Sequence, residues 1–249
     1  MMTLEEFFAR HPKTALGFSG GTDSAYLLYA GRKCGADVRP YYIKTQFQPR
    51  FELSDAQRLC GELGAELCVI EADVLSEELI AANPADRCYH CKRALFTLLS
   101  ERAASDGCTE IIDGTNASDD PCDRPGTMAL RELHVLSPLR DCGITKAEVR
   151  RLSREAGLFT ADRPSYACLA TRIPTGRRID GNTLSMVENA EDKLRELGYV
   201  DLRARVIDGG VRLELPEGML ERAVKERKML LDILGGFGNV TLDLRGRKE

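Results

Sequence analysis

The stretch that decides the fold reads Phe18-Ser19-Gly20-Gly21-Thr22-Asp23-Ser24. A short apolar segment, residues 14–18, leads into it, and an amphipathic segment, residues 25–30, follows it. Glycine tolerates positive φ and lets a ligand approach the backbone closely. The first N–H groups of a helix lack partners within the helix and form the positive end of its dipole. The stretch therefore predicts a strand, an anion-binding loop and a helix; the plainer alternative is an ordinary Gly-Gly turn before a capped helix.

The motif is not a Walker loop, because no Gly-Lys-Ser/Thr follows the glycines. SGGTDS instead resembles the PP-loop of the ATP pyrophosphatase superfamily, whose members split ATP into AMP and pyrophosphate. The resemblance implies a catalytic role for Asp23. It also implies that ATP contacts the whole motif: Phe18, Ser19, Gly20, Gly21, Thr22, Asp23 and Ser24.

Strand-like segments at residues 38–44, 66–70 and 109–113 alternate with helical segments. This alternation predicts an α/β fold with a parallel sheet. Ligands of such sheets bind beyond the carboxyl ends of the strands. We therefore expect ATP contacts from Lys44, which ends the second strand, and from Gly114, Thr115 and Asn116, which follow the fourth. A solvated lysine and a simple polar turn are the alternatives.

Acidic and basic side chains follow the same strand end. Asp119 or Asp120 would supply an oxygen ligand for Mg²⁺, and Arg124 would contact phosphate.

The composition limits the class of protein. The chain has 249 residues, 43% hydrophobic and 30% charged, which is enough for one core plus a small second domain. No apolar run is long enough to span a bilayer, and the acidic, amphipathic N-terminus argues against a signal peptide. We expect a soluble, cytoplasmic protein. The net charge of −4 argues against a nucleic-acid partner with a large footprint.

A change of pattern marks a second domain. We place the first domain at residues 1–176 and a smaller α+β domain at 177–249. The latter shows a helix at 182–197, a hairpin of strands 202–206 and 211–215, a helix to about residue 234 and a strand at 239–244. Arg203 and Arg205 share one strand face by the period of two, so they are either a phosphate clamp or a solvated polar face.

The nine cysteines are odd in number and irregularly spaced, so a disulfide framework is not expected. Cys88 and Cys91 form a CxxC at a predicted helix start, and Cys168 lies in a Pro- and Arg-rich loop. Three thiolates would leave one iron of a [4Fe–4S] cluster open. The alternative is that these cysteines only pack their loops.

Several longer motifs then occur in a fixed order, and together they resemble the LarE family. They are NPADRCYHCK, DGTNASD, RPG, SPLR, TKAEVR and ACLATRIP. LarE proteins are ATP-dependent sulfur transferases that make the nickel-pincer nucleotide cofactor. The resemblance implies that the substrate is a pyridinium biscarboxylic acid mononucleotide, that a carboxylate of it is adenylated, and that sulfur then replaces the adenylate.

The resemblance also implies roles for single residues. Cys168 matches the sulfur-bearing cysteine, which either gives up its own sulfur or joins Cys88 and Cys91 in holding a [4Fe–4S] cluster that supplies sulfide. Arg203 and Arg205 match substrate-phosphate positions, and Glu191 and Glu214 match positions linked to a divalent metal. ATP and Mg²⁺ are the expected cofactors, and we expect a homo-oligomer. A PP-loop tRNA thiolase, an ammonia-using amidating synthetase and a non-enzymatic nucleotide-binding module are the rival hypotheses.

Overall fold

The computed structural model describes residues 2–119, 125–164 and 166–247. Their contacts divide the chain into two compact units. The first unit comprises Met1–Val74 and Asp86–Arg163, and the second comprises Leu75–Ala85 and Pro164–Glu249. This grouping separates the chain at 163/164 rather than 176/177 and adds an earlier segment to the second unit. Because it groups residues by contact and does not measure independent folding, the domain division stays a prediction.

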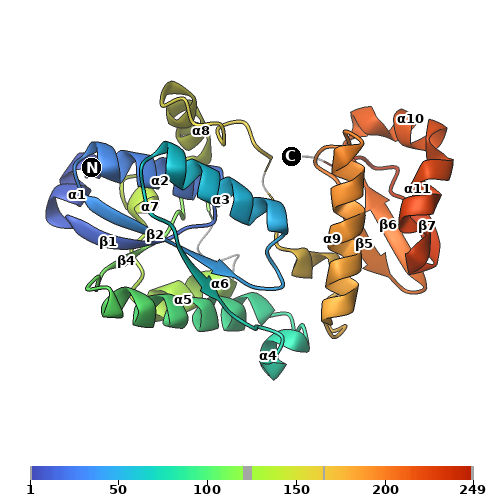
Figure 1. Ribbon diagram of the computed structural model, residues 1–249, viewed down its shortest axis with the longest axis horizontal. Coiled ribbons are helices and arrows are strands. Elements are labelled where there is room, and N and C mark those ends of the chain that lie inside the picture. The colour runs from blue at the N-terminus through green and yellow to red at the C-terminus, as the bar shows by residue number, and fades with distance from the viewer. Residues whose placement is uncertain (1, 120–124, 165, 248–249) are drawn as a thin grey trace. The chain divides into compact units, whose positions relative to one another are not determined.

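The first unit is built on a parallel sheet in the order β3-β2-β1-β4 (Figure 1). Its strands are β1 (Lys13–Gly17), β2 (Asp37–Lys44), β3 (Cys68–Glu71) and β4 (Ile111–Ile112). Its helices are α1 (Leu4–Arg10), α2 (Thr22–Lys33), α3 (Arg50–Glu62), α5 (Arg87–Ser105), α6 (Pro125–Glu132), α7 (Pro138–Asp141) and α8 (Lys146–Glu155). The α/β class with a parallel sheet is confirmed.

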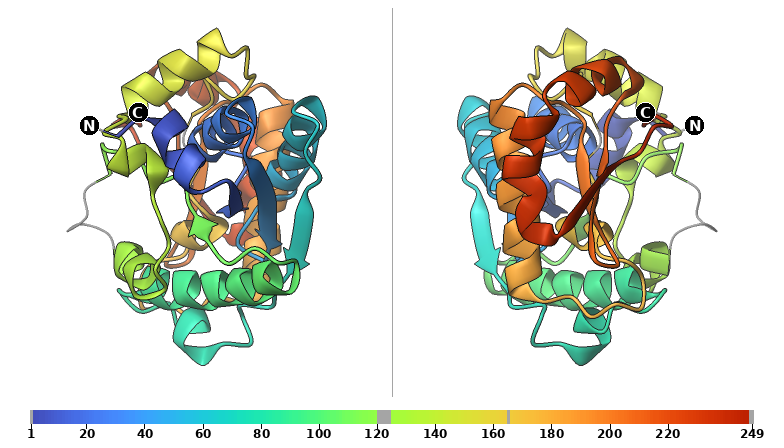
Figure 2. Two further views of the ribbon diagram at one scale, coloured as in Figure 1. Left: turned by 90° about the vertical axis from the view of Figure 1, so that its left-hand side faces the viewer. Right: turned by 90° about the vertical axis from the view of Figure 1, so that its right-hand side faces the viewer.

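Alternate residues of β1, β2 and β4 enter the two cores on either side of this sheet. Leu16 and Tyr42 pack with residues of α1, α2 and α3, whereas Ala15 and Tyr41 pack with Leu99 of α5. Figure 2 shows α5 on one side of the sheet and α1 and α2 on the other. Burial on both faces is clearest in β1, where Thr14, Ala15 and Leu16 are all buried, whereas β3 at the edge of the sheet leaves Val69 and Glu71 exposed.

The second unit is a three-stranded sheet covered by helices, in the order β5-β6-β7. The hairpin of β5 (Arg203–Ile207) and β6 (Gly210–Glu214) is antiparallel, and β7 (Asn239–Leu242) runs parallel to β6. Its helices are α4 (Glu78–Ala81), α9 (Gly181–Glu196), α10 (Glu217–Lys225) and α11 (Arg227–Leu234), with 3₁₀ turns η1 (Leu169–Arg172) and η2 (Gly235–Phe237). The predicted αββαβ order is present, with the fourth element divided into two helices.

Asn83 ties the early segment of the second unit to the later one. Its side chain is 1% exposed, its φ is 56°, and its Nδ2 lies 2.8 Å from the carbonyl oxygen of Pro174 and 3.2 Å from that of Arg177. The Gly176 N–H donates to the Asn83 carbonyl in return, at 2.8 Å. One buried amide thus holds α4 against the loop that precedes α9.

Two local features differ from what the sequence pattern indicates. The pattern of the segment from His134 to Leu139 indicates a short strand, but this segment makes a single bridge, Leu136 with Ile112, and then becomes α7. The helix α6 has no counterpart in the predicted elements. Among the described residues, no helix is both long and apolar enough to cross a bilayer.

Candidate active site

The SGGTDS loop joins β1 to α2. Gly20 has φ +72°, and Gly21 is the N-cap of α2 without a capping side chain. Ser19 Oγ lies 3.1 Å from Ser24 Oγ and accepts from the Gly21 N–H at 3.3 Å. The loop is therefore closed by its own hydroxyls, and the first turn of α2 keeps its N–H groups for an anion.

The carboxyl end of β4 contacts this loop. A Cβ atom placed on Gly114 would lie 2.9 Å from the Ser24 nitrogen, so only glycine fits there. Two residues later, Asn116 Nδ2 donates to Asp23 Oδ1 at 3.2 Å, and between them the Thr115 N–H donates to Asp113. The structure thus brings together the PP-loop and the segment that follows β4.

Lys146 is a site residue that the sequence reading missed. It is the first residue of α8, and its Nζ lies 2.5 Å from Asp23 Oδ2. Lys146 was named only as part of the motif TKAEVR. Thr145 caps the helix, because its hydroxyl accepts from the Glu148 N–H at 3.3 Å. A lysine at the first position of a capped helix in a parallel-sheet protein was the available signal, but only the fold shows that it reaches Asp23.

The structure places the other residues predicted to contact ATP or its Mg²⁺ as follows. Phe18 is buried in the core of the first unit, and the Thr22 hydroxyl donates to the Thr160 carbonyl at 2.8 Å. Lys44 ends β2, where its ammonium donates to the carbonyl oxygen of Gln48. Asp119 Oδ2 accepts from the Asn116 N–H at 3.1 Å. Asp120 and Arg124 lie outside the described residues.

Cys88 and Cys91 lie on the first turns of α5, in the first unit. Cys88 is exposed and Cys91 is partly buried. Because they are three residues apart on a helix, their thiols share one face. Cys168 belongs to the second unit. Within the parts of the chain that the structure describes, no three His, Cys, Asp or Glu side chains gather as a metal-binding group.

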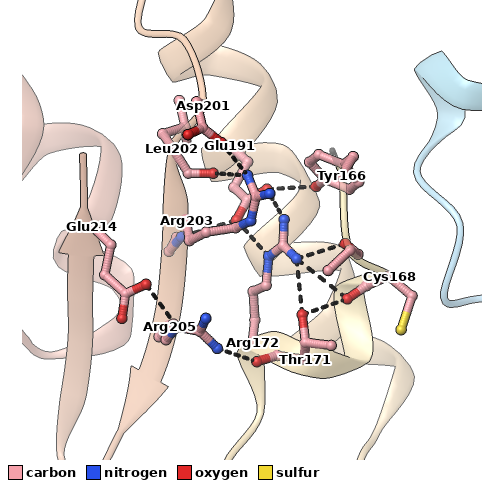
Figure 3. Close-up of polar contacts among 12 residues, drawn as sticks. Tyr166, Cys168, Thr171, Arg172, Glu191, Asp201, Leu202, Arg203, Arg205 and Glu214 are labelled. Atoms are coloured by element: carbon pink, nitrogen blue, oxygen red, sulfur yellow. Dashed lines mark hydrogen bonds and ion pairs between the residues drawn. The ribbon is translucent and has the colours of Figure 1, made fainter. Parts of the chain in front are cut away.

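Cys168 is the N-cap of η1, with φ −53° and ψ 150°. Its carbonyl oxygen accepts from the Thr171 hydroxyl at 2.8 Å and from Arg172 Nη1 at 3.3 Å. Figure 3 shows the sulfur pointing away from these polar contacts. The main chain of the residue is held, while the thiol lies on the other side.

Glu191 is fully buried on α9, and both of its oxygens are occupied. Oε1 accepts from Arg172 Nε and from the Ala204 N–H, each at 2.9 Å, and Oε2 accepts from Tyr166 and Arg195. Burial opposes ionisation, but the hydrogen bonds from Arg172 outweigh it and hold the Glu191 pKa below its usual value. A carboxylate that already accepts from cations on both oxygens does not fit a divalent-metal ligand.

Glu214 is likewise occupied by arginines. Its Oε2 lies 2.8 Å from Arg205 Nε, and its Oε1 lies 3.1 Å from Arg212 Nη2. Arg247 lies within 3.7 Å of the same carboxylate. Two of these guanidinium groups also pair with aspartates, Arg212 with Asp243 and Arg247 with Asp201. Because arginines contact both oxygens of Glu214, the carboxylate does not fit a divalent-metal ligand.

The two predicted phosphate arginines differ in surroundings. Arg203 is 4% exposed; its Nη1 donates to the Leu202 carbonyl at 2.7 Å, and its guanidinium lies 4.8 Å from the Tyr166 ring. Burial, then the charges of Arg172 and Arg247, lowers the Arg203 pKa to about 10. Arg205 is about one-third exposed and donates to Glu214 and to the Thr171 carbonyl.

Comparison with known proteins places this site in a family. No protein-family profile matches the chain. The pyridinium-3,5-bisthiocarboxylic acid mononucleotide synthase of Lactiplantibacillus plantarum, a LarE protein, is 30% identical over 243 residues, which cover 94% of this chain and 86% of the synthase. The chain belongs to the LarE family. The expected relationship is thereby confirmed over nearly the whole length.

Two further proteins are similar to this chain. An uncharacterized protein of Synechocystis is 34% identical over 252 residues, 98% of this chain and 92% of its own. A tRNA-specific 2-thiouridylase of Thermotoga petrophila is 25% identical over 191 residues, 60% of this chain and 53% of its own. This LarE-family protein is an enzyme, a sulfur transferase built on the PP-loop fold.

Proposed function

We propose that this protein adenylates a carboxylate of a pyridinium biscarboxylic acid mononucleotide and then inserts sulfur, releasing AMP, pyrophosphate and the thiocarboxylate. The observation that carries the proposal is the relationship to the LarE synthase over 94% of the chain. The closed SGGTDS loop at the start of α2 agrees with it, because this geometry binds the phosphates of ATP.

The first half-reaction follows from the loop. A carboxylate is a poor electrophile, and attack of its oxygen on the α-phosphorus of ATP makes an acyl-adenylate while pyrophosphate leaves. The α2 N–H groups and Lys146 would hold the departing pyrophosphate, and Asn116 and Lys146 orient Asp23 beside them. Mg²⁺ would arrive on the nucleotide phosphates, as it commonly does, and would offset their charge.

The second half-reaction needs a sulfur nucleophile. The Cys168 thiolate would attack the acyl-adenylate carbonyl, forming a thioester and releasing AMP. Loss of the Cα proton and cleavage of the Cβ–S bond would then release the thiocarboxylate and leave dehydroalanine at residue 168. Alternatively, Cys88, Cys91 and Cys168 would hold a [4Fe–4S] cluster, which would supply sulfide.

Intact-protein mass spectrometry after turnover distinguishes the two sulfur sources. Anaerobically purified protein is incubated with ATP, Mg²⁺ and the pyridinium dicarboxylate nucleotide. Loss of one H₂S from the chain, mapped to Cys168 and equal in amount to the product, identifies the sacrificial route. Many turnovers with Cys168 intact and iron bound identify the cluster route. If this incubation yields no thiolated product, the proposed function is wrong.

The similarity to a thiouridylase supplies the second candidate, a tRNA thiolase. It covers 60% of the chain, against 94% for the LarE synthase. Unmodified tRNA offered in place of the mononucleotide tests it, and thiolated nucleosides in the digested tRNA would favour it. A cytoplasmic location and a homo-oligomeric state stay predictions; fractionation and light scattering would measure them.

A further inference from the structure

Arg172 is the largest side chain that the described part of the chain buries almost completely, with 1% exposed. It lies on η1, four residues after Cys168. Its Nε and Nη2 donate to the two oxygens of Glu191 at 2.9 and 3.0 Å. The guanidinium thus forms a bidentate pair with a carboxylate that is itself fully buried on α9.

The third nitrogen of this guanidinium reaches the cysteine. Arg172 Nη1 donates to the Ala167 carbonyl at 2.7 Å and to the Cys168 carbonyl at 3.3 Å. Thr171 adds its hydroxyl and its N–H to the same Cys168 oxygen, at 2.8 and 3.0 Å. The peptide groups on both sides of the cysteine α-carbon are therefore tied to one buried cation.

Further contacts fix Glu191 in turn. Tyr166 Oη donates to Oε2 at 2.6 Å, and Arg195 Nη2 donates to the same oxygen at 3.1 Å. The Ala204 N–H of β5 donates to Oε1 at 2.9 Å. A continuous series of hydrogen bonds thus links β5 and α9 to the cysteine loop, as Figure 3 shows.

Stability alone does not account for this arrangement. Burial of an ion pair costs free energy of hydration, and the attraction between the two charges barely compensates for this cost. Apolar side chains of similar volume often stabilise a protein as well or better. What a bidentate guanidinium provides beyond that is fixed geometry, because its N–H groups point in set directions. Here those directions lead to the carbonyls beside the thiol-bearing residue.

We propose that Arg172, held by Glu191 and Tyr166, is a positioning residue that fixes the main chain of Cys168 so that its thiol is presented in one orientation for sulfur transfer. The role in sulfur transfer rests on the proposed function. The fixing of the loop does not, and it is measured separately.

Arg172→Lys tests the proposal. Lysine keeps the charge for Glu191, but a single ammonium lacks the planar fork that joins Glu191 to both carbonyls. We expect amide hydrogen exchange in residues 166–173 to become about tenfold faster or more, with the amides of α9 and of the β5–β6 hairpin unchanged. Thiocarboxylate formation should fall about a hundredfold, while ATP–pyrophosphate exchange stays within about twofold.

Tyr166→Phe is the milder second variant, should Arg172→Lys not fold. It removes one hydroxyl from Glu191, and a several-fold loss of thiolation with faster exchange in residues 166–173 is expected. Tyr199→Phe is its matched control, because the Tyr199 hydroxyl also donates to a glutamate of the same unit, Glu226, at 2.7 Å, and Glu226 in turn accepts from Arg222 at 3.0 Å. It should change neither readout.

Unchanged exchange in residues 166–173 in both variants would overturn the proposal, and so would an equal loss of both half-reactions. If the wild-type protein makes no thiocarboxylate, the proposed function fails, while the exchange comparison still decides whether Arg172 fixes the loop.

Discussion

Gly114 lies so close to the first turn of α2 that its position admits no side chain. A Cβ atom there would be 2.9 Å from the Ser24 nitrogen and 3.3 Å from the Asp23 carbonyl carbon, both backbone atoms. The backbone at Gly114, after β4, is therefore in van der Waals contact with the backbone of Asp23 and Ser24. Any side chain at residue 114 must move the loop.

Gly114→Ala should abolish most ATP–pyrophosphate exchange while the protein stays folded. Displacement of the loop costs about 1–3 kcal/mol of stability, as for other overpacked sites. Radioactive pyrophosphate exchange and urea unfolding measure the two effects. Gly61→Ala on α3 is the control, because its Cβ would meet nothing within 4 Å; it should keep full exchange and gain about 0.5–1 kcal/mol. Wild-type exchange in Gly114→Ala would contradict the packing argument.

Lys146 is the cation that the structure places beside Asp23. Lys146→Gln should weaken ATP binding by about 10- to 100-fold, the effect of losing a charged hydrogen bond of about 1.5–3 kcal/mol. Calorimetric titration with a non-hydrolysable ATP analogue measures it. Lys225→Gln breaks only an exposed pair with Glu221 and should bind as the wild type does. Equal affinity of both variants would remove Lys146 from the site.

Arg203 shows what the pattern of a strand can and cannot predict about a residue. The period of a strand correctly places Arg203 and Arg205 on β5. It cannot show that one guanidinium is buried over Tyr166 while the other faces Glu214, since both surroundings come from residues distant in sequence. The loop at residues 18–24 was predictable because its strand–loop–helix geometry depends on its own backbone. The contacts of Lys146 with Asp23 and of Arg172 with Glu191 join residues far apart in the sequence, so the sequence pattern did not show them.

At the scale of elements, η1 and α9 are coupled by one buried ion pair, Arg172 with Glu191. The Glu191 pKa lies below its ordinary value of 4.5 in the folded state, so folding favours the ionised form. The stability from this pair is fully present above the unfolded pKa and is lost as the pH falls through the lower folded pKa. The stability that this ion pair contributes therefore falls in acid and does not change with pH near neutrality.

Glu191→Gln should destabilise the protein by about 3–5 kcal/mol at neutral pH, because it leaves Arg172 buried without a counter-charge. The difference from the wild type should shrink as the pH falls below about 4. Urea unfolding at several pH values measures both. A difference that stays constant from neutral pH to about pH 3 would show that the pair does not contribute through its ionisation.

The segment around α4 is held by Asn83. Asn83→Ala removes the amide that donates to the carbonyls of Pro174 and Arg177, of which Pro174 keeps the Arg177 N–H as a donor at 3.0 Å, and it places alanine at a φ of 56°. The free energy of unfolding should fall by about 2–4 kcal/mol. Asn182→Ala, at an exposed position of α9, should change it by no more than about 0.5 kcal/mol. An equally small effect of both substitutions would refute the clamp.

Elements with a strong period were predictable, and those that depend on tertiary context were not. The helix predicted at 182–197 and the predicted hairpin closely match α9 and the β5–β6 pair. His134 has a positive φ of 54°, and Pro138 starts a helix, so the apolar residues between them cannot extend as a strand. The sequence shows their hydrophobicity but not the single bridge to β4.

At the scale of the whole molecule, the eight described cysteines are all free thiols. The thermal midpoint should therefore be the same, within about 1 °C, with and without reductant, since a disulfide of about 2–4 kcal/mol would shift it by several degrees. Differential scanning calorimetry of protein purified under air and under reductant measures this. A midpoint that falls on reduction would reveal a covalent cross-link.

The second unit is assembled from two pieces of chain, Leu75–Ala85 and Pro164–Glu249, and this has a consequence for synthesis. At the usual ~5–20 residues per second, the ribosome needs about 4–16 seconds to make the intervening residues. Throughout that interval the segment around Ile80 and Ala81 lacks the later residues to which it is bonded, because the Ala81 carbonyl accepts from the Ile179 N–H at 2.7 Å and Asn83 donates to Pro174 and Arg177. The nascent chain thus carries a short apolar sequence within reach of chaperones and proteases, and translation speed becomes a determinant of yield.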